Sequence, residues 1–143
     1  MIINQAKNYR EDTITLLSSE KLPAGDLPAT LENFLIAVQD DELIGVIGLE
    51  IYGNYGLLRS LAVKPAFRNQ NIAGKLIAQI ETLAASKELN AIFLLTETAP
   101  EYFTRKGYQK ITRNDVPDEV QQSSEFSHVC PQSANVMKKD ISN

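Results

Sequence analysis

The length of 143 residues is usual for one domain, and shares of 43% hydrophobic and 22% charged residues are ordinary for a folded globular protein. Fourteen Lys and Arg against eighteen Asp and Glu give a net charge of -4. The two signs are interleaved along the chain, which excludes a basic surface for nucleic acid. No apolar run approaches the roughly 20 residues that cross a bilayer, so we expect no membrane partner. These features predict a single domain over residues 1–143.

The single cysteine, Cys130, excludes an internal disulfide, and the first residues lack the basic and then apolar run of a signal peptide. Both features favour a reducing cytoplasm. Cys130 is a candidate substrate contact, although a lone cysteine beside a proline is more often buried packing. Because a soft metal or metalloid centre normally requires several thiolates, we predict no metal site.

The first thirty residues predict a strand, a helix and a loop. Residues 1–6 are apolar enough for an edge strand, and an exposed edge allows a homodimer. Asn8, with Glu11 three positions later, is typical of a helix N-terminus and predicts a helix to about Ser19. Residues 22–29 contain two prolines and a glycine, which predict a loop.

Three strands are predicted in the next stretch. Residues 34–38 and 43–52 are β-rich apolar runs around the polar turn 39–42, which is typical of a hairpin. Residues 57–63 are a third apolar run, so the three strands would form an antiparallel meander.

The second half of the chain alternates between helices and strands. Apolar residues from Ala73 to residue 84 recur at helical spacing and predict one buried helical face. A strand over 91–96, a helix over 100–106 and a strand over 108–112 come next, and residues 134–139 are a last candidate strand. Residues 114–133 are polar and are expected to be irregular. The pattern predicts an α/β fold with a mixed sheet.

The segment between the strand over 57–63 and the long helix is the best candidate for a ligand site. Free backbone N–H groups at a helix N-terminus suit a pyrophosphate, Arg68 and Lys75 add positive charge, and the small Ala73 and Gly74 allow close approach. An ordinary strand-to-helix connection is the alternative. The candidate cofactor-binding residues are Leu61, Ala62, Val63, Arg68, Asn69, Gln70, Asn71, Ile72, Ala73, Gly74, Lys75 and Phe103.

This segment resembles the GNAT acetyltransferase family, whose strand ends in a Val-x-Pro-like stretch before Arg or Gln, two residues, Gly, one residue, and Gly or Ala. Arg68, Asn71 and Ala73 match, with Asn71 at the usual glycine. Asparagine adopts the left-handed conformation more readily than other non-glycine residues, so the turn is expected to survive. The resemblance covers nearly the whole chain and implies a GNAT-like, mainly antiparallel sheet flanked by helices, with acetyl-coenzyme A as co-substrate.

A second block, residues 99–108, is similar to the family's Ala-x-x-x-Tyr-x-x-x-Gly-Phe helix and strand. The family's tyrosine is often the general acid that protonates the leaving thiolate. Counting back four positions from Gly107 gives Phe103, which carries no proton and is expected to pack against the cofactor or the core. Tyr102 lies about 100° away around the helix and is the candidate acid.

A finer resemblance involves residues 57–63, 94–99, 125–126 and 130–134, which are similar to the small GNAT proteins of arsenic-resistance operons. It implies transfer of acetyl to the amino group of a small molecule, with arsenicals and other toxic compounds among the candidates. Glu125 is a candidate catalytic base, and a surface carboxylate that caps a turn is the alternative.

The candidate substrate contacts are Arg59, Ser60, Arg113 and Cys130. Only one of Arg59 and Ser60 can face the cleft, because neighbours on a strand point to opposite sides. Arg59 would clamp a carboxylate if it faced inward; otherwise it would be a solvent-facing partner of an acid. Ser60 is alternatively sheet filler, and Arg113 a surface residue.

Two further functions stay open beside the small-molecule acetyltransferase. Asn71 and Phe103 depart from the family pattern, which favours a binding or regulatory module that keeps the fold without transferring acetyl. A protein acetyltransferase, with residues 22–29 and 114–133 shaping a peptide groove, is the other alternative.

Overall fold

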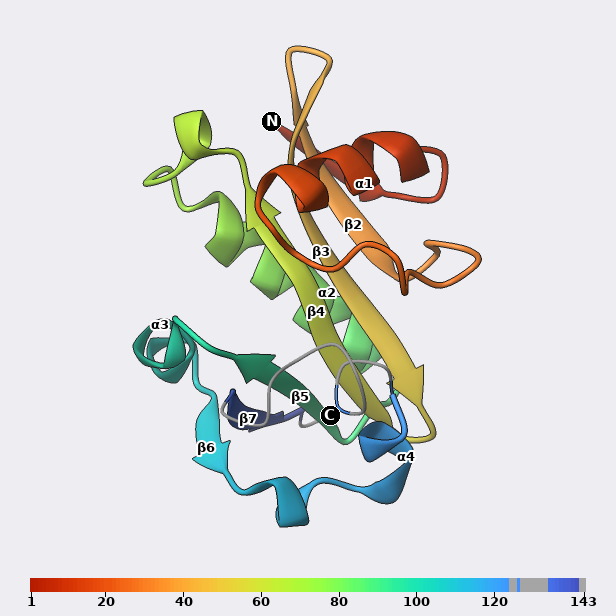
Figure 1. The fold of residues 1–143 in the computed structure, drawn as a ribbon, viewed down its shortest axis with the longest axis vertical. Helices are drawn as coiled ribbons and strands as arrows, with labels where there is room; N and C mark the ends of the chain where they lie inside the picture. Colours follow the sequence, from red (N-terminus) through yellow and green to blue (C-terminus); the bar gives the residue numbers. More distant parts are fainter. Residues whose placement is uncertain (124–125, 127–133, 142–143) are drawn as a thin grey trace. The chain divides into compact units, whose positions relative to one another are not determined.

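The computed structural model describes residues 1–123, 126 and 134–141, and its strands lie in the order β1-β2-β3-β4-β5-β7-β6 in one sheet (Figure 1). The strands are β1 (Ile2–Gln5), β2 (Phe34–Gln39), β3 (Glu42–Tyr52), β4 (Tyr55–Val63), β5 (Ala91–Thr96), β6 (Gln109–Ile111) and β7 (Asn135–Asp140). The helices are α1 (Arg10–Ser19), α2 (Ile72–Ser86), α3 (Pro100–Arg105) and α4 (Asp118–Gln121). β4 and β5 are parallel and the other assigned ladders antiparallel, which confirms the predicted GNAT-like α/β fold.

The chain falls into two compact units. Unit 1 comprises residues 1–49 and 59–83, and unit 2 comprises residues 50–58 and 84–143. Strands β3 and β4 and helix α2 contribute residues to both. The expectation of a single domain over residues 1–143 stays a prediction.

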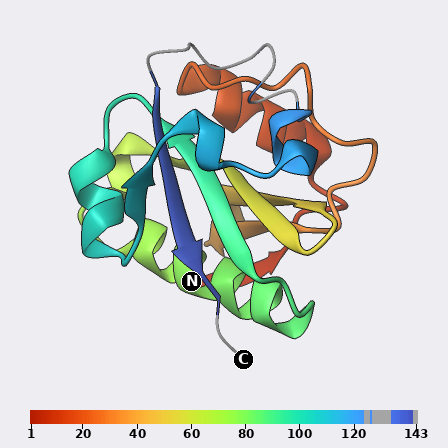
Figure 2. The ribbon, with the colours of Figure 1, turned by 90° about the horizontal axis from the view of Figure 1, so that it is seen from below.

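In unit 1, β1 forms the edge of the sheet, as predicted, and pairs with β2 from Ile2 opposite Val38 to Gln5 opposite Leu35. Helix α1 and most of α2 lie on opposite faces of these strands, which two views at right angles show (Figure 1, Figure 2). Leu16 and Leu17 of α1 are buried in a cluster with strand residues that include Phe34, Ile36 and Val46. Burial of this apolar face fixes α1 on the sheet.

Gly45 of β3 allows α2 to approach the sheet closely. A Cβ at this position would lie 3.2 Å from Leu76 Cδ1 and 3.4 Å from the Ala62 carbonyl oxygen, both tight contacts. The α2 residues Ile72, Leu76, Ile77, Ile80 and Ala84 are buried, which confirms the apolar face expected from the sequence. The start of α2 is therefore anchored by core packing.

The predicted N-cap at Asn8 is wrong by one residue. Tyr9 is the N-cap of α1 and makes no side-chain cap hydrogen bond. The Tyr9 amide donates to the Ala6 carbonyl at 2.8 Å, and the Thr13 amide donates to the Tyr9 carbonyl at 2.9 Å. A backbone turn after β1 therefore sets the helix start in place of a polar side chain.

The β2–β3 turn confirms the predicted hairpin. Asp40 and Asp41 have φ of 53° and 64°, which is the backbone of a two-residue hairpin turn with both central residues left-handed. Aspartate tolerates this conformation better than most side chains.

In unit 2, the predicted last strand is confirmed as β7, which pairs with both β5 and β6. Its ladder with β5 runs from Ala91 opposite Asp140 to Thr96 opposite Asn135. The expectation that residues 114–133 are irregular is wrong for α4. Val116, which precedes α4, and Val120 within it belong to a buried cluster that includes Phe93, so burial of two valines stabilises a short helix in a polar stretch.

Candidate functional site

The connection from β4 to α2 is an exposed loop with two left-handed residues. β4 ends at Val63, and a 3-10 turn comes next over Pro65–Phe67. Asn69 and Asn71 have φ of 67° and 60°, and both are exposed. The expectation that asparagine adopts the left-handed conformation at position 71 is confirmed.

The start of α2 presents backbone donors. The first helical hydrogen bond runs from the Lys75 amide to the Asn71 carbonyl at 3.1 Å. The amides of Ile72, Ala73 and Gly74 precede that bond, and no residue in the described part of the chain accepts from them. Such amides lie at the positive end of the helix dipole and suit a phosphate. Ala73 and Gly74 carry no bulk that would keep a ligand from this backbone.

Arg68 lies beside these amides in the sequence and is held by two groups of unit 1. Its Nε donates to the Val63 carbonyl at 3.3 Å, and its guanidinium forms an ion pair with Glu20. The Arg68 side chain is 53% exposed, and Lys75 is also exposed. Glu20, just after α1, was missed because nothing in the sequence links it to a residue 48 positions later.

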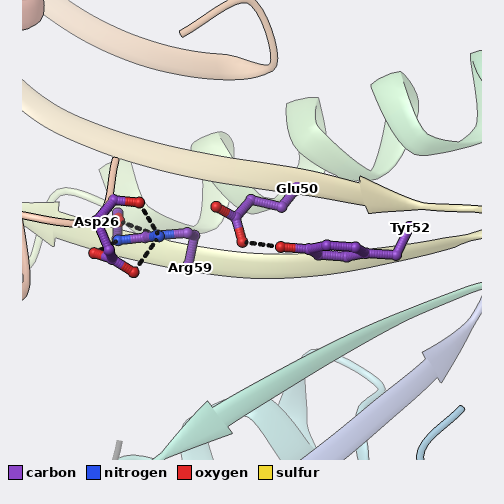
Figure 3. Close-up of polar contacts among 5 residues, drawn as sticks. Asp26, Glu50, Tyr52 and Arg59 are labelled. Atoms are coloured by element: carbon purple, nitrogen blue, oxygen red, sulfur yellow. Dashed lines mark hydrogen bonds and ion pairs between the residues drawn. The ribbon is translucent and has the colours of Figure 1, made fainter. Parts of the chain in front are cut away.

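Arg59 is buried in β4. One alternative made it a solvent-facing partner of an acid; it does pair with an acid, but it does not face solvent. Its Nη1 and Nη2 each donate to a carboxylate oxygen of Asp26 at 2.8 Å (Figure 3). Its Nε donates to Ser60 Oγ at 2.9 Å. Ser60 has φ of 60°, a left-handed residue inside a strand, which is typical of a bulge. Asp26 was not predicted, because its loop gives no pattern that identifies a partner.

Residues 61–63 come directly after this turn. Leu61 is half-buried, whereas Ala62 and Val63 are 6% and 8% exposed. Their side chains therefore mainly pack, so any contact with a ligand falls to their backbone.

Glu50 and Tyr52, near the end of β3, form a further polar contact in unit 2. The Tyr52 hydroxyl donates to Glu50 Oε1 at 2.8 Å (Figure 3). Both residues are half-buried and lie two positions apart, so they share one face of the strand. Neither was predicted; the available signal was two polar residues, two positions apart, at the end of an otherwise mainly apolar strand.

Helix α3 holds Tyr102 and Phe103. Phe103 is 7% exposed and packs edge-on against Tyr108, with 5.7 Å between ring centroids. Burial raises the pKa of Tyr102 above its usual value of 10, and the charge of Arg105 partly opposes this rise. The Tyr102 hydroxyl therefore stays protonated at neutral pH, as a proton donor must.

Three other candidates stay predictions. The Arg113 guanidinium lies 5.5 Å from the centroid of the Phe126 ring in unit 2, a cation–π contact. Glu125 and Cys130 lie outside the described residues. Within the described ranges, no group of three or more His, Cys, Asp or Glu side chains is placed to hold a metal, and no helix has the length and apolar character to cross a membrane.

Comparison with known proteins gives both sequence relatives and solved structures with the same fold. An uncharacterized N-acetyltransferase from Chlorobaculum tepidum is 29% identical over 91 residues, which are 63% of this chain and 58% of that protein. A GNAT-family acetyltransferase from Staphylococcus aureus superposes with a TM-score of 0.78 at 21% identity, covering 99% of both chains. N-acetylglutamate synthase from Neisseria gonorrhoeae, solved with coenzyme A and N-acetyl-glutamate, gives 0.81 at 17% identity over 99% of this chain and 35% of its own.

The chain therefore spans less than two thirds of the length of the Chlorobaculum protein and about a third of the synthase. The acetyltransferase (GNAT) domain family matches residues 30–110, which run from the loop before β2 to β6. This match covers more than half of the chain. It includes the loop before α2, Glu50 and Tyr52 of β3, and Arg59 of β4, but not Asp26. The chain belongs to the GNAT acetyltransferase domain family.

Proposed function

We propose that the protein transfers an acetyl group from acetyl-coenzyme A to the amino group of a small molecule. The observation that carries this proposal is the start of α2, next to the left-handed Asn71. There the amides of Ile72, Ala73 and Gly74 precede the first helical hydrogen bond and are not used by it. Membership of the GNAT family makes coenzyme A the expected occupant, and the similar Neisseria synthase was solved with it.

The pyrophosphate would accept hydrogen bonds from the three α2 amides, with Arg68 and Lys75 supplying positive charge. The backbone amides of residues 61–63 would hold the thioester carbonyl and the pantetheine arm. A neutral amine would then attack the thioester carbon, so that a C–N bond forms while the C–S bond breaks. Holding both reactants in line supplies much of the acceleration in such a direct transfer.

Two protons must move in this reaction. The attacking amine must lose a proton to a base, for which Glu125 is the candidate, and the leaving thiolate takes up a proton. Tyr102 can donate one, since burial keeps its pKa above the usual value. A thiol has a pKa of about 8.5, so water can also protonate the thiolate, and Tyr102 is therefore an aid to the reaction and not a requirement.

For the acceptor, we propose a small amine-bearing compound, with arsenicals among those to be tested because of the sequence resemblance to arsenic-resistance proteins. Arg113 and Cys130 are proposed acceptor contacts, whereas the hydroxyl of Ser60, the other candidate on β4, accepts a hydrogen bond from Arg59 Nε. The single cysteine supports a reducing cytoplasm as the compartment. A homodimer through β1 is proposed from its position at the sheet edge.

The first test is isothermal titration with acetyl-coenzyme A, with coenzyme A and ATP as comparison ligands. We expect acetyl-coenzyme A to bind, and Ala73→Glu to weaken binding about 100-fold or more, because a like charge beside a phosphate costs several kcal/mol. Gln79→Glu is the matched control, since it adds the same charge on an exposed position of α2. Equal affinity of the two variants would remove the start of α2 from the site.

A second measurement separates the enzyme from a binding module. The alternative is favoured by Phe103, which is packed in unit 2 and supplies no proton. Thiol release from acetyl-coenzyme A should rise above the blank with at least one member of a panel of amino acids, polyamines, arsenicals and lysine-containing peptides. Binding without release on any acceptor would support the module, and release only with peptides would support a protein acetyltransferase.

A further inference from the structure

We propose that Asp26, Arg59 and Ser60 form a positioning cluster that holds β4 in its left-handed turn and thereby aims the amides of residues 61–63. The inference rests on the proposed function of those amides. It assigns Arg59 a role inside the protein, where its charge is directed at Asp26 and not at a substrate carboxylate.

The ion pair between Arg59 and Asp26 has a fixed geometry. Arg59 contacts Asp26 through 2.8 Å bonds from Nη1 and Nη2 to the two carboxylate oxygens and through a 3.4 Å contact from Nη1 to the main-chain carbonyl. The Arg59 side chain is 0% exposed and that of Asp26 is 16% exposed. A two-pronged pair at this burial fixes both position and orientation, which a single contact to a flexible lysine would not do.

The neighbouring residue, Ser60, has a strained backbone. Its φ is 60°, a conformation that non-glycine residues avoid and that persists only where the surroundings impose it. The Arg59 Nε donates to Ser60 Oγ at 2.9 Å. One guanidinium therefore holds both the loop that carries Asp26 and the side chain of the left-handed residue.

The last three residues of β4 depend on the conformation of Ser60. A left-handed residue in a strand reorients the peptide groups that come after it, and residues 61–63 come directly after Ser60. Hydrogen-bond donors that stabilise charge on a reacting carbonyl must be about 2.7–3.1 Å from it, and a displacement of about 1 Å costs roughly 100-fold in rate. Loss of the cluster should therefore reduce turnover without removing any group that touches substrate.

The first experiment measures the turn itself and needs no activity. In the full chain, the three-bond coupling between the amide and α protons of Ser60 reports its φ. Asp26→Asn keeps the shape of the side chain and removes its charge, so we expect this coupling to move towards strand values. Asp140→Asn is the control, because it breaks the exposed Lys138–Asp140 pair on β7. An unchanged coupling in both Asp26→Asn and Arg59→Lys would overturn the proposal.

The second experiment uses the best acceptor from the amine panel. For Asp26→Asn we expect kcat to fall at least about tenfold, with the acceptor KM and coenzyme A affinity within about twofold of wild type. Asp26→Asn combined with Ser60→Gly should recover most of kcat, because glycine adopts positive φ without support from a side chain. A selective fall in KM for carboxylate-bearing amines would mean that Asp26 masks a substrate clamp, which would also overturn the proposal.

The two experiments distinguish failure of the positioning cluster from failure of the proposed acetyl transfer. If wild-type protein releases no thiol with any acceptor, the proposed transfer fails, yet the Ser60 coupling in Asp26→Asn still decides whether the cluster holds the turn. If thiol release is normal and Asp26→Asn changes neither kcat nor the coupling, the cluster fails while the transfer stands.

Discussion

The start of α2 and the cluster around Arg59 lie in the same unit and are built in opposite ways. The start of α2 presents backbone groups of residues adjacent in the sequence, and the exposed loop before it contains two left-handed asparagines. The Arg59 cluster is made of side chains, is buried, and joins residues 33 positions apart. Positions 69 and 71 should therefore tolerate side chains that accept a positive φ. Substitutions in the Arg59 cluster should change both the local geometry and the stability of the fold.

The largest expected effect is on stability, from Asp26→Ala. Removing one partner of a buried ion pair leaves an uncompensated charge and costs about 3 kcal/mol of unfolding free energy. Glu42→Ala is the matched comparison, because it breaks the Lys64–Glu42 pair, whose side chains are 38% and 48% exposed, and should cost about 1 kcal/mol or less. Urea unfolding of both variants measures the difference. Equal losses would mean that burial does not distinguish the two pairs.

A smaller effect is expected at Asn71. Asn71→Val places a β-branched side chain at φ of 60°, which costs about 1–2 kcal/mol and should weaken coenzyme A binding about tenfold as the loop shifts. Asn71→Gly accepts the same angle and should bind at least as well as wild type. Titration calorimetry and thermal unfolding measure the two effects.

Gln70→Val is the control for this substitution. It puts the same side chain on the neighbouring exposed residue, which does not have a positive φ, and should leave binding within about twofold of wild type. If Gln70→Val and Asn71→Val behave alike, the site depends on loop side chains and the contrast with the Arg59 cluster disappears.

The smallest effect concerns Tyr102 on α3, which belongs neither to the start of α2 nor to the Arg59 cluster. Burial raises its pKa, so the folded protein holds this proton more tightly than the unfolded chain does. The resulting stabilisation is complete below pH about 10 and is lost as the pH rises through the folded-state pKa. Compared with Tyr102→Phe, wild type should lose about 1 °C more of Tm between pH 8 and pH 10.5. An identical pH dependence would show that Tyr102 is as well hydrated as in the unfolded chain.

Local features were predictable from the sequence. The α2 face, the hairpin turn at Asp40 and Asp41, and the left-handed Asn71 each depend on residues within one or two turns of one another. The last strand was identified from its composition, although its position between β5 and β6 was not. The predictions for the cap of α1 and for α4 were wrong because a backbone turn and two buried valines outweighed the propensities of nearby polar residues.

Long-range polar partners were not predictable. Asp26 and Glu20 come from a loop and a helix end whose sequences fit any solvent-exposed segment, yet each pairs with an arginine of unit 1. Glu50 and Tyr52 were missed for a different reason, since an apolar strand with polar positions usually indicates a half-buried surface. Such contacts depend on tertiary placement, and a single sequence carries no record of it.

The ion pair between Glu20 and Arg68 would lower the free energy that Arg68 contributes to binding the proposed pyrophosphate. A phosphate that replaces Glu20 on this guanidinium gains only the difference between two ion pairs and not the full strength of one. Glu20 is the C-cap of α1, so this replacement would also free a side chain at the end of that helix. Ligand binding before α2 would thereby change the contacts of α1.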